Sequence, residues 1–168
     1  MKTQRRSRLS IMKTEEISVR LIKALKTAGK TVASPESCTG GGIGHVLTAI
    51  PGSSAVYAGG VISYTNAVKE RVLNVPAVTL DKHGAVSAET AGFMAKGVRE
   101  LMFSDFGISV TGIAGPDGDG SGKPVGLVYI GVAFDEGVHT HEFLFEGDRS
   151  AVREQAIQAA LELIFARL

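Results

Sequence analysis

A run of small polar residues beside a glycine cluster offers the first candidate chemistry in this chain. Residues 34–44 read Ser-Pro-Glu-Ser-Cys-Thr-Gly-Gly-Gly-Ile-Gly, with a short apolar segment before them and apolar residues at helical spacing after them. This order predicts a strand, a tight turn and a helix start, which can expose one hydroxyl or thiol beside free backbone N–H groups. Such groups stabilise a phosphate or a developing oxyanion, and the sequence leaves open which of the two. A Ser/Thr helix cap followed by permissive glycines is the plainer interpretation.

Ser37 and Cys38 are the two candidate nucleophiles in this turn. A serine hydroxyl needs a neighbouring base before it can attack a carbonyl carbon. A cysteine at a helix N-terminus would have a lowered pKa and raised reactivity, or it would simply be a small buried residue under the turn. Neighbouring residues in a turn point in different directions, so the sequence leaves the choice between them open.

Lys69 is the candidate base, in Tyr64-Thr65-Asn66-Ala67-Val68-Lys69 just after a predicted strand. It can accept a proton only when neutral, which requires burial or nearby positive charge to lower its pKa. On spacing alone, a solvated helix lysine is the favoured interpretation. The four histidines form no triad order with an acid, and His139 and His141 lack a third ligand at metal-binding spacing. No metal site is predicted.

A second glycine-rich stretch, residues 111–124, follows a predicted strand over residues 108–110. Its composition indicates either a mobile surface loop or a ligand-binding loop. Asp117 and Asp119 are interpreted as turn formers rather than catalytic acids. Arg149 precedes the last predicted helix, where it is either a surface cation or a phosphate contact.

The predicted elements indicate a single-domain α/β sandwich with a mixed sheet. Helices are predicted near residues 17–28, 40–50, 65–73, 87–102 and 150–168, and strands near 31–34, 55–64, 108–110, 125–134 and 138–146. Helical crossovers favour parallel early strands, whereas a hairpin makes the late strands antiparallel. Gly59 and Gly60 predict a bulge or a close backbone approach. Ligands bind at the carboxyl ends of such strands, so the turns 35–44, 64–69 and 111–124 are predicted to converge on one pocket.

Composition sets the broad class. The chain has 168 residues, a net charge of +1 and 44% hydrophobic residues, which predicts one globular domain and no general nucleic-acid binder. No apolar run approaches the ~20 residues of a membrane helix. A single cysteine excludes an internal disulfide framework and fits a cytoplasmic protein. The basic residues 1–12 are expected to be a disordered tail rather than a targeting segment.

Seven motifs, in order, resemble the CinA C-terminal domain family, also known as the PncC nicotinamide-nucleotide amidohydrolases. They occupy residues 36–41, 51–54, 64–69, 83–87, 112–118, 123–126 and 147–149. The resemblance implies a domain over residues 13–168 that hydrolyses the carboxamide of nicotinamide mononucleotide, in bacterial pyridine nucleotide recycling, with no metal or other cofactor. Many relatives carry a further N-terminal domain that resembles molybdopterin-binding proteins, so this chain is expected to be a stand-alone deamidase. A homo-oligomer that binds neither nucleic acid nor membrane is expected.

The resemblance also assigns roles, with Ser37 and Lys69 at the positions of the family's Ser–Lys pair. Neutral Lys69 would take the proton of Ser37 as it attacks the carboxamide, and Tyr64 would orient Lys69 or bind the amide. The N–H groups of residues 39–41 would hold the oxyanion, and those of residues 112–115 or Arg149 the phosphate. The expected substrate-binding residues are Cys38, Thr39, Gly40, Gly41, Asn66, Thr111, Gly112, Gly115 and Arg149.

Two alternatives of other kinds stay open at this point. One is a non-catalytic module that binds a nucleotide or phosphate through its glycine turns. The other is a cysteine hydrolase that uses Cys38 as its nucleophile.

Overall fold

The computed structural model describes residues 14–168, and the tail predicted for residues 1–12 lies outside the described residues. The helices of the described part are α1 (Thr14–Ala28), α2 (Gly42–Thr48), α3 (Asn66–Leu73), α4 (Ala77–His83), α5 (Ala88–Met102) and α6 (Arg149–Phe165), with a short 3₁₀ helix at Ser53–Ala55. The strands are β1 (Val32–Glu36), β2 (Tyr57–Ile62), β3 (Phe106–Gly112), β4 (Leu127–Phe134) and β5 (Gly137–Leu144).

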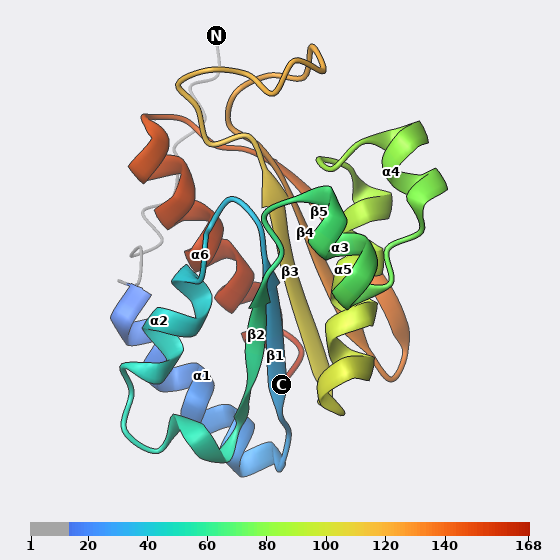
Figure 1. Cartoon of the computed structure of the whole chain (residues 1–168). Helices are drawn as coiled ribbons and strands as arrows, with labels where there is room; N and C mark the ends of the chain where they lie inside the picture. Colours follow the sequence, from blue (N-terminus) through green and yellow to red (C-terminus); the bar gives the residue numbers. More distant parts are fainter. Residues whose placement is uncertain (1–13) are drawn as a thin grey trace, which may run out of the picture.

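The strands form a mixed sheet in the order β2-β1-β3-β4-β5. Strand β1 runs parallel to β2 and β3, because helical crossovers return the chain to the same end of the sheet. Strand β4 is antiparallel to β3 and β5. Helices α1, α2 and α6 cover one face of the sheet, and α3, α4 and α5 lie on the other (Figure 1). The predicted α/β class, with a mixed sheet and antiparallel late strands, is confirmed. Within residues 14–168, none of the helices is both long and apolar enough to cross a membrane.

Several element bounds differ from those predicted. Strand β1 continues through Pro35 and Glu36, because Glu36 pairs with both β2 and β3. Strand β3 continues to Gly112, so Thr111 and Gly112 belong to the sheet rather than to the loop. Helix α4 was not predicted, since its seven residues are too few to show a helical repeat of apolar positions. His83, expected in a loop, is the last residue of this helix.

The pair Gly59-Gly60 marks both of the irregularities that the sequence predicted. The register between β1 and β2 shifts by one residue, so that Val32 lies opposite Tyr57 and Ala33 opposite Gly59. A Cβ atom on Gly60 would lie only 2.6 Å from the carbonyl oxygen of Ser34. The two backbones can therefore approach this closely only because residue 60 has no side chain.

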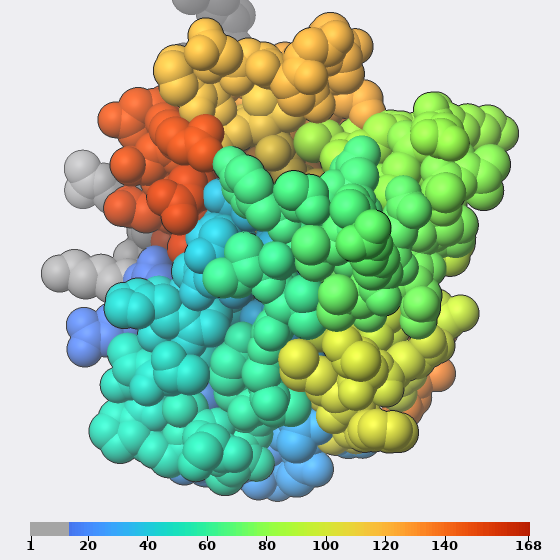
Figure 2. All heavy atoms as spheres, viewed as in Figure 1, coloured from blue at the N-terminus to red at the C-terminus, as the bar shows by residue number. Residues whose placement is uncertain are grey.

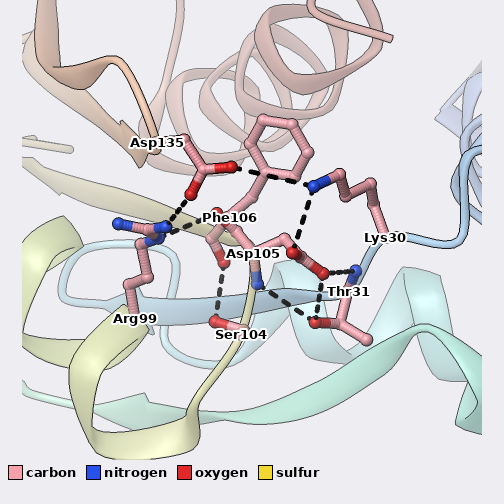
Figure 3. Close-up of polar contacts among 7 residues, drawn as sticks. All are labelled: Lys30, Thr31, Arg99, Ser104, Asp105, Phe106 and Asp135. Carbon is pink, nitrogen blue, oxygen red and sulfur yellow. Dashed lines mark hydrogen bonds and ion pairs between the residues drawn. The ribbon is translucent and has the colours of Figure 1, made fainter.

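A polar cluster ties together the amino ends of β1 and β3 (Figure 3). The carboxylate of Asp105 accepts hydrogen bonds from the N–H of Thr31 at 2.8 Å and from its hydroxyl at 3.1 Å, and it pairs with Lys30 at 3.3 Å. Burial acts to raise the pKa of Asp105, but these contacts outweigh it and lower the pKa. Arg99 donates to the backbone carbonyl of Asp105 at 2.9 Å and contacts Asp135. The cluster holds β1 in register with β3, so their carboxyl ends lie side by side.

Candidate active site

The turn after β1 is built over the buried carboxylate of Glu36. One oxygen of this carboxylate accepts hydrogen bonds from the N–H of Ile43 at 2.8 Å and from the hydroxyl of Thr39 at 2.7 Å. The other accepts a hydrogen bond from the N–H of Gly44 at 3.2 Å. Both N–H groups belong to the first turn of α2, where they have no partner within the helix. The positive end of α2 is therefore neutralised by the chain's own carboxylate.

A cation holds the other side of the same turn. The guanidinium of Arg153, on α6, donates to the carbonyl oxygen of Cys38 at 3.0 Å and to that of Thr39 at 3.1 Å. The N–H of Ser37 donates to Val110 in β3 at 2.9 Å. The backbone around Ser37 is thus fixed by β3, by Glu36 and by Arg153, and these contacts come from three separate regions of the chain.

Lys69 reaches this turn from α3. The hydroxyl of Thr65 caps the helix by accepting a hydrogen bond from the N–H of Val68, and Lys69 follows on the buried side. Lys69 is 1% exposed, and its Nζ atom lies 3.2 Å from Ser37 Oγ. The same amine donates to the carbonyl oxygen of Ser63 at 2.7 Å and to that of Tyr64 at 3.4 Å. The favoured interpretation from spacing, a solvated lysine, is wrong.

Burial lowers the pKa of Lys69 to about 8, which brings its neutral form within reach at neutral pH. A thiolate at Cys38 would act in the opposite direction, but burial raises the pKa of the Cys38 thiol to about 11. The thiol is therefore uncharged where Lys69 titrates. A neutral amine can donate its two N–H groups to the carbonyl oxygens of Ser63 and Tyr64 and still present its lone pair to the Ser37 hydroxyl. The arrangement can remove a proton from Ser37.

Ser37 and Lys69 line a cavity of about 300 Å³ at the carboxyl end of the parallel strands. The cavity walls are residues 37–38, Tyr64 and Lys69, residues 85–86, residues 111–115 and 117–119, and Arg149. Figure 2 shows the atoms of the loop after β3, of the start of α6 and of α3 and α4 meeting at this end of the molecule. The three turns that the sequence predicted to converge do meet here.

The structure brings most of the expected site residues together and leaves four outside. Those that line the cavity are Ser37, Cys38, Tyr64, Lys69, Thr111, Gly112, Gly115 and Arg149. Those that do not line it are Thr39, Gly40, Gly41 and Asn66. The hydroxyl of Thr39 is buried against Glu36, and the N–H of Gly40 donates back to Ser37 O at 3.1 Å. Asn66 is exposed at the start of α3. These four residues serve the turn and the helix start.

Sequence reasoning missed one wall of the cavity, the connection between α4 and α5 at Ala85 and Val86. The hydroxyl of Thr111, which is buried, donates to the carbonyl oxygen of Ala85 at 2.7 Å. Thr111 therefore positions this wall. Ser87 is the residue whose type could have predicted this wall from the sequence. It caps α5 by accepting a hydrogen bond from the N–H of Thr90, and so brings the preceding residues to the same end of the sheet.

Arg149 is the first residue of α6, which Asp148 caps through the N–H of Ala151. Its guanidinium donates to the carbonyl oxygen of Gly115 at 2.7 Å and to the Tyr64 hydroxyl at 3.3 Å. Gly115 has a left-handed backbone, with φ of +87°, which favours glycine at this position. Arg149 therefore joins α6 to the loop after β3 and places a positive charge at the exposed rim of the cavity.

Asp119 and His139, which the sequence also raised, make contacts typical of structural residues. Asp119 accepts a hydrogen bond from the N–H of Ser121 at 2.9 Å, which is the turn-forming contact expected of it. The ring of His139 packs against Phe134, with 5.2 Å between centroids. Among residues 14–168, no three or more His, Cys, Asp or Glu side chains are grouped so that they could hold a metal ion.

Comparison with known proteins gives one consistent result. The family model described as the CinA C-terminal domain matches residues 14–168. A CinA-like protein of Synechococcus sp. is 47% identical over 150 residues, which are 88% of this chain and 36% of that protein. The chain thus spans little more than a third of the length of the curated relatives it matches.

Solved structures cover the same region nearly end to end. The crystal structure of a competence/damage inducible protein from Agrobacterium tumefaciens is 41% identical with a TM-score of 0.88, and the match covers 91% of this chain and 94% of that one. A CinA superfamily protein from Klebsiella pneumoniae is 34% identical with a TM-score of 0.90, covering 93% and 98%. With the fold, the family model and these relatives in agreement, this chain belongs to the CinA C-terminal domain family.

Proposed function

We propose that this chain hydrolyses the carboxamide of nicotinamide mononucleotide to give nicotinate mononucleotide and ammonia, with Ser37 as the nucleophile. The observation that carries the proposal is the buried amine of Lys69, 3.2 Å from Ser37 Oγ, at the wall of a cavity. A serine hydroxyl beside a base of lowered pKa is the arrangement that acyl transfer requires. The cavity of about 300 Å³ lies at the lower end of the range for small-molecule sites.

The first step of the proposed reaction forms the bond between Ser37 Oγ and the carboxamide carbon, while neutral Lys69 takes the hydroxyl proton. The N–H groups of residues 39–41, expected to hold the oxyanion, do not line the cavity. We assign this role to the N–H of Cys38, which follows the nucleophile and makes no hydrogen bond to another described residue. One such donor contributes about 3 kcal/mol to the stability of the transition state.

In the second step the carbon–nitrogen bond breaks, and the proton held by Lys69 leaves with the amine as ammonia. Lys69 is then neutral again and takes a proton from water as the water oxygen attacks the ester carbon on Ser37. Release of nicotinate mononucleotide returns that proton to Ser37 Oγ. One amine therefore serves as base and acid in each half of the reaction, as microscopic reversibility requires.

Arg149 and the backbone after β3 form the proposed phosphate site. The guanidinium lies at the cavity rim, and the N–H groups of Ala114 and Gly115 make no hydrogen bond to another described residue. A cation beside free amides favours an anion. Tyr64 is 60% exposed, and its hydroxyl accepts a hydrogen bond from Arg149. We therefore place its side chain beside the ribosyl phosphate half of the substrate, while its carbonyl oxygen accepts a hydrogen bond from Lys69.

The test is ammonia release from nicotinamide mononucleotide by the purified chain. We expect Ser37→Ala and Lys69→Met to lower kcat by at least about 10³-fold, whereas Lys82→Met, on the exposed side of α4, keeps the wild-type rate. A folded wild type that binds the nucleotide without releasing ammonia would instead identify a non-catalytic binding module. Full activity of Ser37→Ala would remove the proposed nucleophile.

The setting that this reaction implies is pyridine nucleotide recycling in the bacterial cytoplasm. The family resemblance further implies a homo-oligomer, which sedimentation velocity on the purified chain would detect as a mass above the 17.6 kDa of one chain.

A further inference from the structure

Four consecutive carbonyl groups, those of residues 83–86, each accept a hydrogen bond from a side chain. The carbonyl of Gly84 accepts from the hydroxyls of Ser87 and Thr90, at 3.1 and 2.7 Å. That of Ala85 accepts from Thr111. The first and last of the four accept from a single amine, Nζ of Lys123, which lies 2.8 Å from His83 O and also contacts Val86 O. Side-chain hydrogen bonds therefore hold the chain in place at each carbonyl group from the end of α4 to the residue before Ser87.

Lys123 comes from a different part of the molecule. It lies in the loop between β3 and β4, about 40 positions after the carbonyls that it contacts. The carbonyl of His83 ends α4, where the helix dipole favours a cation. The side chain is half-buried, so its hydrogen bonds are less exposed to water than those of a surface lysine.

The two segments that Lys123 joins both contribute to the cavity wall. Residues 85–86 form one part, and residues 113–119 of the loop form another. On its other side the loop is held by Arg149, through the carbonyl of Gly115. The loop is thus attached to α6 by one cation and to the α4–α5 connection by another.

We propose that Lys123 is a positioning residue that sets the affinity for substrate by holding residues 85–86 against the loop after β3. The choice of substrate rests on the function proposed above. Lys123 takes no part in the contacts that fix the other side of the cavity. Ser37 is held by Val110 and Lys69 by Ser63, and the turn around Ser37 is held by Glu36 and Arg153. Loss of the Lys123 amine therefore weakens binding and leaves the chemical step intact.

Steady-state kinetics with nicotinamide mononucleotide separate these effects. In Lys123→Met we expect KM to rise by about five-fold or more, with kcat within about two-fold of wild type. Lys123→Arg retains donors for both carbonyl groups and should recover most of the lost affinity. Lys82→Met, an exposed lysine beside His83, is the matched control with unchanged KM. An unchanged KM in Lys123→Met, or a fall in kcat as large as the fall in kcat/KM, overturns the proposal.

Hydrogen exchange followed by mass spectrometry tests the same contact without any substrate. Peptides covering residues 83–87 and 113–126 should both exchange faster in Lys123→Met than in wild type, and peptides of α1 and α6 should not change. Lack of ammonia release by the wild type would refute the proposed function, and exchange alone would then decide whether Lys123 couples the two walls. Unchanged exchange in these two peptides overturns the inference in either case.

Discussion

The carboxylate of Glu36 accepts a hydrogen bond from the N–H of Ile43 at 2.8 Å. A carboxylate of the chain itself thus lies at the N-terminus of α2, where an external anion would otherwise bind. The glycine-rich turn, which in the sequence left open a site for a phosphate or an oxyanion, thus holds its own carboxylate. The consequence is a rigid support beneath Ser37, because the residue that closes the turn directly precedes the proposed nucleophile.

Replacing this carboxylate should damage stability and activity together. In Glu36→Gln an amide NH₂ replaces one acceptor oxygen and leaves a buried N–H or hydroxyl donor without its partner. We expect a loss of about 2 kcal/mol in the free energy of unfolding, measured with urea, and a lower kcat. Glu70→Gln, at an exposed position on α3, should stay within about 0.5 kcal/mol of wild type. Equal stabilities of the two variants would show that Glu36 does not support the turn.

The pH dependence of the proposed reaction follows from Lys69. Only the neutral amine can take the Ser37 proton, and the pKa of Lys69 is lowered to about 8 by burial. The rate constant kcat/KM should therefore rise about tenfold per pH unit at low pH and become level above an apparent pKa of about 8. Rates measured between about pH 6.5 and 9.5 avoid the second ionisation of the substrate phosphate, near 6. A profile that is flat over this range would contradict a lysine base.

The same pKa shift predicts how stability changes with pH. The pKa of Lys69 is about 8 in the folded chain, because the amine is buried, and lies near the ordinary value of 10.5 in the unfolded chain. Between these values the unfolded state binds more protons, so burial of Lys69 becomes less unfavourable as pH rises. The unfolding free energy of the wild type, relative to Lys69→Met, should rise by on the order of 3 kcal/mol from pH 7.5 to 10.5. Urea unfolding of both proteins at the two pH values measures this difference, and a constant difference would indicate an unshifted lysine.

Arg149 provides a test of the proposed phosphate site. Arg149→Ala removes the cation at the cavity rim, so KM for nicotinamide mononucleotide should rise by about tenfold or more. Nicotinamide riboside, which lacks the phosphate, should show little difference between wild type and Arg149→Ala. Arg71→Ala, an exposed arginine on α3, is the control. An equal loss on both substrates would assign Arg149 to positioning the Gly115 loop rather than to the phosphate.

Cys38 should be dispensable as a nucleophile. Its thiol is buried with a pKa raised to about 11, so very little thiolate exists at neutral pH. Cys38→Ala is expected to keep kcat within about threefold of wild type, because its proposed contribution is a backbone N–H. Iodoacetamide at pH 7.5 should leave the wild type active. Rapid inactivation by this reagent, together with an inactive Cys38→Ala, would favour the cysteine hydrolase.

Much of the architecture could be predicted because it depends on local patterns. Apolar periodicity indicated most helices and strands, and the chain direction made the early strands parallel, so the turns after them had to meet at one edge of the sheet. The topology alone therefore predicted that Ser37, Lys69 and the loop after β3 lie near one another. Helix α4 escaped prediction because its seven residues are too short to show a repeat.

Tertiary packing decided the properties on which the chemistry depends. Lys69 and Glu70 are adjacent charged residues in the sequence, yet one is buried and the other exposed, because only the first faces Ser37 and Ser63. Residues 39–41 do not line the cavity, so the proposed oxyanion role passes to another N–H group. The amine of Lys123 contacts the carbonyl oxygen of His83, 40 positions earlier in the chain. Local sequence sets which face of an element is apolar, but the dielectric around one amine and the partners of one carboxylate depend on residues that only folding brings near.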